Sequence, residues 1–334
     1  MAATAVGLVL GAGGVVGQAY HAGVLAALEN DLGWDARTAD LLVGSSAGSV
    51  TSTLLRLGVP ASDLAAWAVE APLSPDLEPL LRHVARDQVD DFPALRARDL
   101  MRGWRVPSPA LFARVARRPW ALRPMVIAAT MAPTGCVDIA ERAELLRLLG
   151  AGSWPEGLLV CATRRSDGRR VVFGREGAPP AGCCSAVAAS CAIPGYFCPV
   201  TIGGTEYIDG GVHSPTNADV LSGRGLDLVI VVSPMSAARG RVRSADAPLR
   251  WSAHRRLARE VARLRAEGTT VVRFEPDQRC LGVMGLNAMD RSRVAAVVQQ
   301  AFLETGRHLR HPGVLERLSS VDVRAARRKA ALAA

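Results

Sequence analysis

One serine in this 334-residue chain lies where a protein could activate it as a nucleophile. Apolar residues from Leu41 run into Gly44-Ser45-Ser46-Ala47-Gly48, and a small-residue helical pattern follows. G-x-S-x-G between a predicted strand and a predicted helix is typical of a sharp turn that exposes the serine hydroxyl. Gly44 and Gly48 would leave room for the turn, and the first helical amides would favour negative charge. The pattern predicts Ser46 as a nucleophile, with a plain β–α turn as the alternative.

A glycine-rich loop lies near the start of the chain. Ala5–Leu10 is a short apolar run typical of a buried strand, and Gly11-Ala12-Gly13-Gly14 precedes the helical pattern of Val15–Glu29. Backbone amides in such a loop can hold an anion. The amides of Gly13 and Gly14 would suit the oxyanion of an acyl-transfer intermediate. A turn that only packs the helix against the strand is the alternative.

The same loop, from Gly11 to Gly17, superficially resembles a dinucleotide-binding fingerprint. That interpretation would make the protein an NAD(P)-binding oxidoreductase. Two features oppose it. The sixth position of G-x-G-x-x-G, counted from Gly11, is Val16, and the next strand, which ends at Val43, has no acidic residue at its tip for a ribose hydroxyl. The oxyanion interpretation is therefore favoured.

An aspartate followed by two glycines ends a predicted strand late in the chain. Tyr207-Ile208-Asp209-Gly210-Gly211 would place Asp209 on a tight turn, where Gly210 and Gly211 allow close backbone approach. Taken alone, the aspartate could equally be a residue that only caps this turn.

Strands and helices alternate around these motifs. Strands are predicted over 158–163, 170–174, 227–232 and 270–274, with a hairpin over 200–208 that turns at Gly203-Gly204. Helices are predicted over 61–70, 139–149, 181–191, 215–221, 249–267, 290–308 and 314–334. This alternation predicts a mainly parallel sheet covered by helices on both faces, a three-layer α/β/α fold. Residues 5–310 would form one domain, and 311–334 a basic C-terminal helix.

The stretch from about 72 to 133 differs from the rest of the chain. It has many prolines, dense charge over 82–91 and 96–105, and the aromatic residues Phe92, Trp104, Phe112 and Trp120. Short amphipathic helices over 95–102 and 110–118 would make it a helical insertion. A solvated cap is the simpler interpretation, and contact with lipid through arginine and tryptophan is the other.

Composition limits the function classes. Hydrophobic residues make up 49% of the chain and charged residues 21%, as in a folded globule. The net charge of +9 could favour phospholipid head groups. The arginines are too scattered, and the aromatic residues too few, to indicate nucleic acid binding. Seven cysteines without C-x-x-C indicate buried free thiols in a reducing cytoplasm and no metal site. We expect no signal peptide and no transmembrane span.

Together these motifs resemble the patatin-like phospholipase family over roughly residues 5–232. The family has a glycine-rich oxyanion loop after the first strand, a G-x-S-x-G nucleophile and a late D-G-A/G aspartate. Here Gly13–Gly17, Gly44–Gly48 and Asp209–Gly211 occur in that order, and Ser190-Cys191-Ala192-Ile193-Pro194-Gly195 resembles a further family segment. The resemblance implies a patatin-like hydrolase domain over 5–310, which uses no cofactor and no metal.

The resemblance also implies a catalytic pair of Ser46 and Asp209, without a histidine as base. Ser46 would attack the carbonyl of a lipid ester, and Asp209 would take its proton. An aspartate with an ordinary pKa of about 3.9 is a weak base at neutral pH. We therefore expect desolvation to raise this pKa. A Ser-His-Asp triad that uses His21 or His213 is the alternative.

Two positions depart from the family pattern. Ala12 stands where the family usually has glycine, and Val16 stands where it usually has a basic residue that could help to hold an anion or a lipid phosphate. The second departure favours a neutral lipid, a lysolipid or a small ester over a phospholipid. It also leaves open a catalytically silent scaffold that binds lipid or a partner. We expect a cytoplasmic protein, with peripheral membrane contact left open and its oligomeric state unpredicted.

Overall fold

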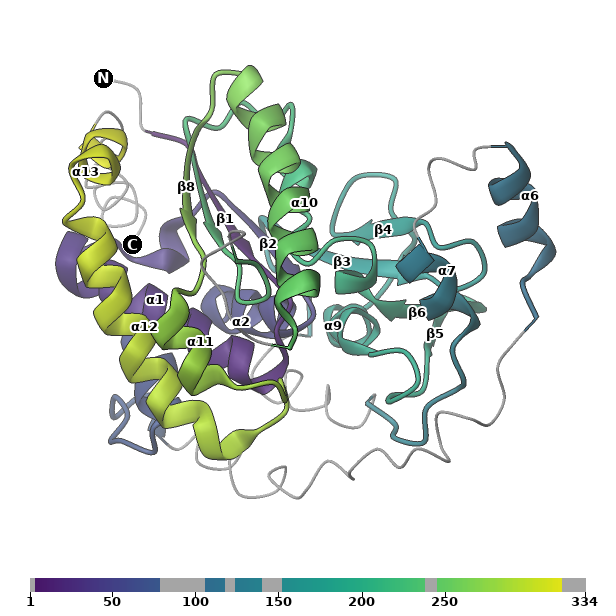
Figure 1. Cartoon of the computed structure of the whole chain (residues 1–334), viewed down its shortest axis with the longest axis horizontal. Helices are drawn as coiled ribbons and strands as arrows, with labels where there is room; N and C mark the ends of the chain where they lie inside the picture. The colour runs from purple at the N-terminus through teal and green to yellow at the C-terminus, as the bar shows by residue number, and fades with distance from the viewer. Residues whose placement is uncertain (1–3, 79–105, 118–123, 140–151, 238–244, 320–334) are drawn as a thin grey trace.

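A computed structural model of the chain describes residues 4–78, 106–117, 124–139, 152–237 and 245–319. Its central feature is an eight-stranded sheet with the order β5-β6-β3-β2-β1-β7-β8, in which β4 also pairs with β3 (Figure 1). The strands are β1 (Val6–Leu10), β2 (Leu41–Ser45), β3 (Leu158–Arg164), β4 (Arg170–Phe173), β5 (Val200–Ile202), β6 (Thr205–Asp209), β7 (Leu228–Val232) and β8 (Thr270–Phe274).

The strand directions divide the sheet into two parts. β3, β2, β1, β7 and β8 are parallel to their neighbours in this series, whereas β4, β5 and β6 add antiparallel pairs beside β3. Every residue of β1 and β7 is buried, as expected of central strands that are covered on both faces. The prediction of a mainly parallel sheet is confirmed.

Helices cover both faces of the sheet (Figure 1). Leu8 of β1 belongs to an apolar cluster with Tyr20 and Val297, whereas its neighbour Val9 belongs to a cluster with Leu257. Successive strand residues point to opposite faces, so α1 and α12 lie on one face and α10 on the other. The α-helices are α1 (Gly14–Leu32), α2 (Ala47–Arg56), α3 (Ala61–Ala68), α6 (Pro109–Arg117), α7 (Pro124–Met131), α9 (Cys183–Cys191), α10 (Ala247–Ala266), α11 (Gln278–Met284), α12 (Val294–Leu309) and α13 (Pro312–Ser319).

Two differences from the predicted elements stand out. The helix α11 was not predicted, and the predicted helix over 215–221 is wrong. Only a short 3-10 helix, η4 (Ala218–Leu221), forms in that region. Asn217, which precedes it, has φ 54° and ψ 31°, a left-handed conformation that no α-helix interior contains. Another 3-10 helix, η3 (Gly210–Val212), follows β6 directly.

Several predictions fall outside the described residues. They are the charged runs 82–91 and 96–105, the helix over 95–102, the residues Phe92, Trp104 and Trp120, most of the helix over 139–149, and the chain beyond 319. Within the described part of the insertion, α6 confirms the helix predicted over 110–118. The division into a domain over 5–310 and a C-terminal helix stays a prediction, of which α13 is the described beginning.

Two further observations bear on the composition of the chain. No helix in the described ranges combines the length and the apolar character needed to cross a membrane. All seven cysteines are free, and Cys161, Cys183 and Cys280 are buried. Cys136 is exposed, so the prediction of buried thiols is wrong at that position.

Candidate active site

The predicted nucleophile lies on a strained turn between β2 and α2. Ser46 has φ 53° and ψ −124°, a positive φ that is uncommon for a residue with a side chain. The residue is only 4% exposed, so the prediction of an exposed hydroxyl is wrong. A Cβ at Gly48 would lie 1.8 Å from the backbone oxygen of Leu10, and one at Gly44 would lie 2.4 Å from the Cα of Ser49. The two glycines of G-x-S-x-G therefore allow the first helical turn to pack against β1 and against the strand that precedes it.

Hydrogen bonds fix the backbone of this turn. The amide of Ser46 donates to Ser190 Oγ at 2.9 Å, and Ser190 Oγ donates to the carbonyl of Cys161 at 2.6 Å. The carbonyl of Ser46 accepts from Ser49 Oγ at 2.7 Å. The Ser46 side chain lies close enough to the carboxylate of Asp209 to act on it as a hydrogen-bond donor and to lower its pKa. The structure thus brings the side chains of the predicted pair close together.

Strand β3 aligns the two segments that carry this pair. Ser45 of β2 pairs with Cys161, and Asp209 of β6 pairs with the next residue, Ala162. Both partners lie on the same side of β3, because β4 occupies the other side at these residues. β2 is parallel to β3 and β6 is antiparallel to it, so the carboxyl ends of β2 and β6 meet. Ser46 follows one end, and Asp209 is the other.

Asp209 is buried with few polar partners. Its side chain is 5% exposed and accepts a hydrogen bond from the amide of Gly211 at 2.6 Å. Burial raises its pKa to about 6, although the hydrogen bonds from Ser46 and Gly211 act in the opposite direction. A Cβ at Gly210 would lie 2.0 Å from the carbonyl oxygen of Cys161, which explains the first glycine of this turn. The desolvation that a basic aspartate requires is present.

The glycine loop lies between the two motifs. A Cβ at Gly48 would be 2.9 Å from the oxygen of Gly11, and one at Gly211 would be 2.8 Å from the Cβ of Ala12. The amides of Gly11 and Ala12 donate to Val232 and Pro215, whereas those of Gly13 and Gly14 donate to no group in the described part of the chain. Two predicted oxyanion donors therefore remain available.

The loop glycines are needed for packing to different degrees. Gly14 has φ 61°, and a Cβ there would lie 2.6 Å from the oxygen of Ala288. A Cβ at Gly13 would lie 2.7 Å from the Cα of Gly17. One at Gly17 would meet only ordinary contacts with Pro234.

The two histidines proposed as alternative bases, His21 and His213, both have lowered pKa values. His21 is fully buried, its Nδ1 lies 3.4 Å from Thr51 Oγ1, and burial lowers its pKa to about 3. Burial also lowers the pKa of His213 to about 4, with Arg170 acting in the same direction. The lowered pKa values make both rings weaker proton acceptors than an ordinary histidine.

The sequence analysis assigned no role to the polar residues behind the pair, although Ser190 belongs to a segment that resembles the family. Asn217 donates to Ser45 Oγ at 2.8 Å and to the carbonyl of Gly210 at 3.2 Å. Ser190 holds the amide of Ser46, as described above. The available signal was the run Ser214-Pro215-Thr216-Asn217, whose polar residues come directly after Asp-Gly-Gly. Among the described residues, no group of three or more histidine, cysteine or acidic side chains could hold a metal ion.

Comparison with protein families identifies the chain. The family model described as patatin-like phospholipase matches residues 8–222, more than half of the sequence. The chain belongs to the patatin-like phospholipase family. The resemblance inferred from the motifs is therefore confirmed, and membership is consistent with hydrolysis of lipid acyl esters.

Solved structures provide distant matches. VipD from Legionella pneumophila is 14% identical with a TM-score of 0.43, over 96% of this chain and 67% of VipD. Human GIVD cytosolic phospholipase A2 is 12% identical with a TM-score of 0.39, over 97% and 59%. ExoU in its complex with SpcU from Pseudomonas aeruginosa is 18% identical with a TM-score of 0.37, over 95% and 52%. This chain thus spans little more than half of two of these proteins. Comparison with curated proteins gave no match.

Proposed function

We propose that this protein is a serine hydrolase that cleaves lipid esters through Ser46 and Asp209. The observation that carries the proposal is the proximity of the Ser46 side chain to the buried Asp209 carboxylate, whose pKa it lowers. A carboxylate with a pKa of about 6 is ionised at neutral pH yet basic enough to take part in proton transfer. The strained backbone of Ser46 supports the same role, because such strain gathers at functional sites.

The reaction would proceed in two acyl-transfer steps. Ser46 Oγ attacks the ester carbonyl while its proton passes to Asp209, and the carbonyl oxygen becomes an oxyanion. The free amides of Gly13 and Gly14 donate to this oxyanion, and one such donor is worth about 3 kcal/mol of barrier. Asp209 then protonates the departing alcohol. Water repeats the sequence on the acyl-enzyme and releases the fatty acid.

Apolar residues near the site favour a substrate with a hydrocarbon chain. Met289 Sδ would lie 3.0 Å from a Cβ at Gly14, and nearby in the sequence Leu286 is 67% exposed. Val212, three residues after Asp209, packs against the cluster that Leu111 and Val126 form. The site thus has apolar neighbours beside both the glycine loop and the aspartate turn.

The head group is expected to be neutral or small. Val16 is 2% exposed and lies in the main apolar cluster, so this position offers no cation to a phosphate. We therefore expect a monoacylglycerol ester to be cleaved faster than a lysophospholipid or a diacyl phospholipid with the same acyl chain. A panel of these three substrates with matched chains tests this preference.

Peripheral membrane contact would use the exposed side of α6 and α7. Phe112 is 70% exposed and Met125 is 57% exposed, and Arg117 is exposed on the same helix as Phe112. Phe112→Ser should weaken cosedimentation with vesicles of phosphatidylcholine and phosphatidylglycerol. Leu303→Ser is the matched control, since Leu303 is 52% exposed on α12. Equal loss in both variants would count against this face.

Covalent labelling with a fluorophosphonate tests the chemistry without knowledge of the substrate. We expect one adduct on Ser46 in the wild type, none in Ser46→Ala, and strongly slowed labelling in Asp209→Asn. Ser185→Ala, at an exposed serine of α9, controls for non-specific reaction and should label like the wild type. No adduct on folded wild-type protein would favour the silent lipid-binding scaffold instead. Loss of labelling in His213→Ala but not in Asp209→Asn would favour a histidine base.

A further inference from the structure

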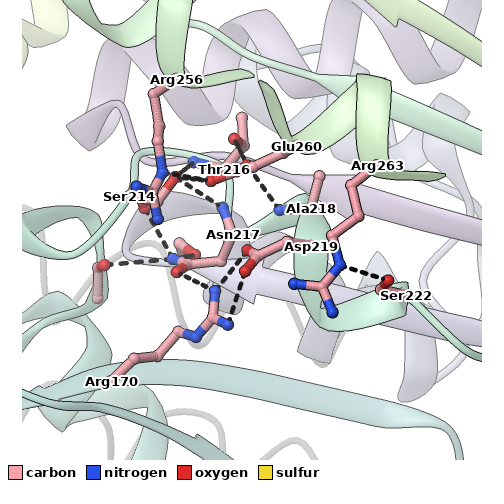
Figure 2. Close-up of polar contacts among 12 residues, drawn as sticks. Arg170, Ser214, Thr216, Asn217, Ala218, Asp219, Ser222, Arg256, Glu260 and Arg263 are labelled. Atoms are coloured by element: carbon pink, nitrogen blue, oxygen red, sulfur yellow. Dashed lines mark hydrogen bonds and ion pairs between the residues drawn. The ribbon is translucent and has the colours of Figure 1, made fainter. Parts of the chain in front are cut away.

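A buried polar segment lies directly behind the predicted pair. Residues 214–218 follow the aspartate turn and are bound to α10 through Glu260, which is 3% exposed (Figure 2). Glu260 accepts hydrogen bonds from Ser214 Oγ at 2.7 Å, from Thr216 Oγ1 at 2.7 Å and from the amide of Ala218 at 3.0 Å. One carboxylate thus holds three successive parts of the segment.

Asn217 links this segment to both catalytic strands. Its side chain is fully buried, and its Nδ2 donates to Ser45 Oγ at 2.8 Å, to Ser214 O at 2.7 Å and to Gly210 O at 3.2 Å. Ser45 immediately precedes Ser46, and Gly210 immediately follows Asp209. A single amide group therefore joins the residue that precedes Ser46 to the residue that follows Asp209.

The orientation of this amide is fixed from its other side. Asn217 Oδ1 accepts from Arg170 Nη1 at 3.1 Å. Arg170 is itself held by Asp219 through contacts of 2.5 and 2.9 Å, as Figure 2 shows. The guanidinium can only donate, so it fixes which end of the Asn217 amide faces the catalytic strands. The left-handed backbone of Asn217 suits asparagine better than most residues.

The segment also reaches the glycine loop. The amide of Ala12 donates to the carbonyl of Pro215 at 2.7 Å. The oxyanion loop, the nucleophile turn and the aspartate turn are consequently attached to the same five residues.

We propose that Asn217 is the positioning residue that sets the placement of Ser46 relative to Asp209. The carboxyl ends of β2 and β6 meet beside β3, where Ser45 pairs with Cys161 and Asp209 pairs with Ala162. Each of the two strands ends there. Ladder hydrogen bonds to β3 end at these residues. Ser190 holds the amide of Ser46 to β3, whereas Asn217 joins the residue before Ser46 to the residue after Asp209. The inference rests on the proposed function, in which the Ser46 proton passes to Asp209.

The test uses Asn217→Asp, which keeps the shape, the left-handed tolerance and an oxygen toward Arg170. It replaces the Nδ2 donor with an acceptor that faces three oxygens. A misplacement of about 1 Å can slow a reaction by about 100-fold. We expect the saturating rate of fluorophosphonate labelling to fall by about that factor, with the half-saturating probe concentration unchanged. A change in half-saturation alone would contradict a positioning role.

Two further variants separate positioning from loss of fold. Ser45→Ala removes only one acceptor of the amide and should slow labelling less than Asn217→Asp. Asp63→Asn alters another buried carboxylate, which binds Ser74 beside α3, and should label like the wild type even if its melting temperature falls. Equal slowing in Asp63→Asn and Asn217→Asp would assign the effect to general destabilisation and overturn the inference.

Crystal structures keep this inference separable from the proposed function. If wild-type protein is not labelled, the proposed hydrolase function fails. The positioning role is then decided by the distance between Ser46 Oγ and the Asp209 carboxylate, which should be longer in Asn217→Asp than in the wild type. An unchanged distance in that variant, or labelling at the wild-type rate, overturns the inference.

Discussion

The burial that suits Asp209 to its proposed catalytic role should also lower the free energy of unfolding. It raises the pKa of this carboxyl from 3.8 to about 6 in the folded chain. Above that pH the folded protein holds a charge that water solvates better in the unfolded chain. A rise of about two pKa units corresponds to about 3 kcal/mol. We therefore expect Asp209→Asn to raise the free energy of unfolding by about 3 kcal/mol at about pH 7.5, while labelling of Ser46 is nearly lost.

The pH dependence of this gain has a definite sign. Below pH 3.8 the carboxyl is protonated in both the folded and the unfolded chain, so its charge costs nothing. As the pH rises through the window up to about 6, the unfolded chain releases the proton before the folded chain does. The destabilisation grows through that window and is complete above it. The advantage of Asp209→Asn should therefore fall to about 1 kcal/mol at about pH 4.5.

Urea unfolding followed by circular dichroism at the two pH values measures both numbers. Asp219→Asn is the matched control, for which the expected change in the free energy of unfolding has the opposite sign. Burial acts to raise the pKa of Asp219, but the hydrogen bond and charge of Arg170 outweigh it and lower that pKa. Asp219→Asn should therefore be less stable than the wild type at neutral pH. The reasoning is refuted if Asp209→Asn is no more stable than the wild type at about pH 7.5, or if its gain is the same at both pH values.

Three other outcomes follow from the same geometry. The labelling rate of Ser46 should rise about tenfold per pH unit below about pH 6 and level off above it, because only ionised Asp209 takes the proton; a flat profile would contradict this. Ser46→Gly should have a free energy of unfolding about 1 kcal/mol higher than that of Ser46→Ala, because both variants lose the hydroxyl and only glycine relieves the strain of the positive φ. Gly48→Ala should lower the free energy of unfolding by about 2–3 kcal/mol, because its Cβ would clash with the backbone of Leu10. Gly182→Ala, with open space around it, should lose little by the same urea measurement.

The parts of the site that depend on local geometry could be predicted from the sequence. Gly44, Ser46 and Gly48 lie within one turn, so their spacing already encodes the strained backbone and the close packing that the structure contains. Asp209 could be predicted as half of the pair only through the family resemblance. Its Asp-Gly-Gly pattern alone also fits a residue that merely caps a turn, and its side chain does accept from Gly211.

The supporting residues could not be predicted because their partners are distant in the sequence. Ser190 bonds to the amide of Ser46, and Glu260 bonds to residues 214–218 from a helix on the opposite face of the sheet from α1. The helix predicted over 215–221 failed for the same reason. Thr216 and Asn217 bond to tertiary partners that require an irregular, partly left-handed backbone, and these bonds outweigh local helix propensity.

Asp209 and Asp219 lie on either side of residues 214–218 in the sequence, and they differ in their relation to Arg170. Asp219 pairs with Arg170, which lowers its pKa. Asp209 forms no ion pair within the described residues and has a raised pKa. If Arg170 contacted Asp209 instead, the carboxylate would be stabilised as an anion and would accept a proton from Ser46 poorly. In the proposed mechanism, Asn217 links the Arg170–Asp219 pair to the two turns through a neutral amide, so it can position Asp209 without lowering the pKa of its carboxyl.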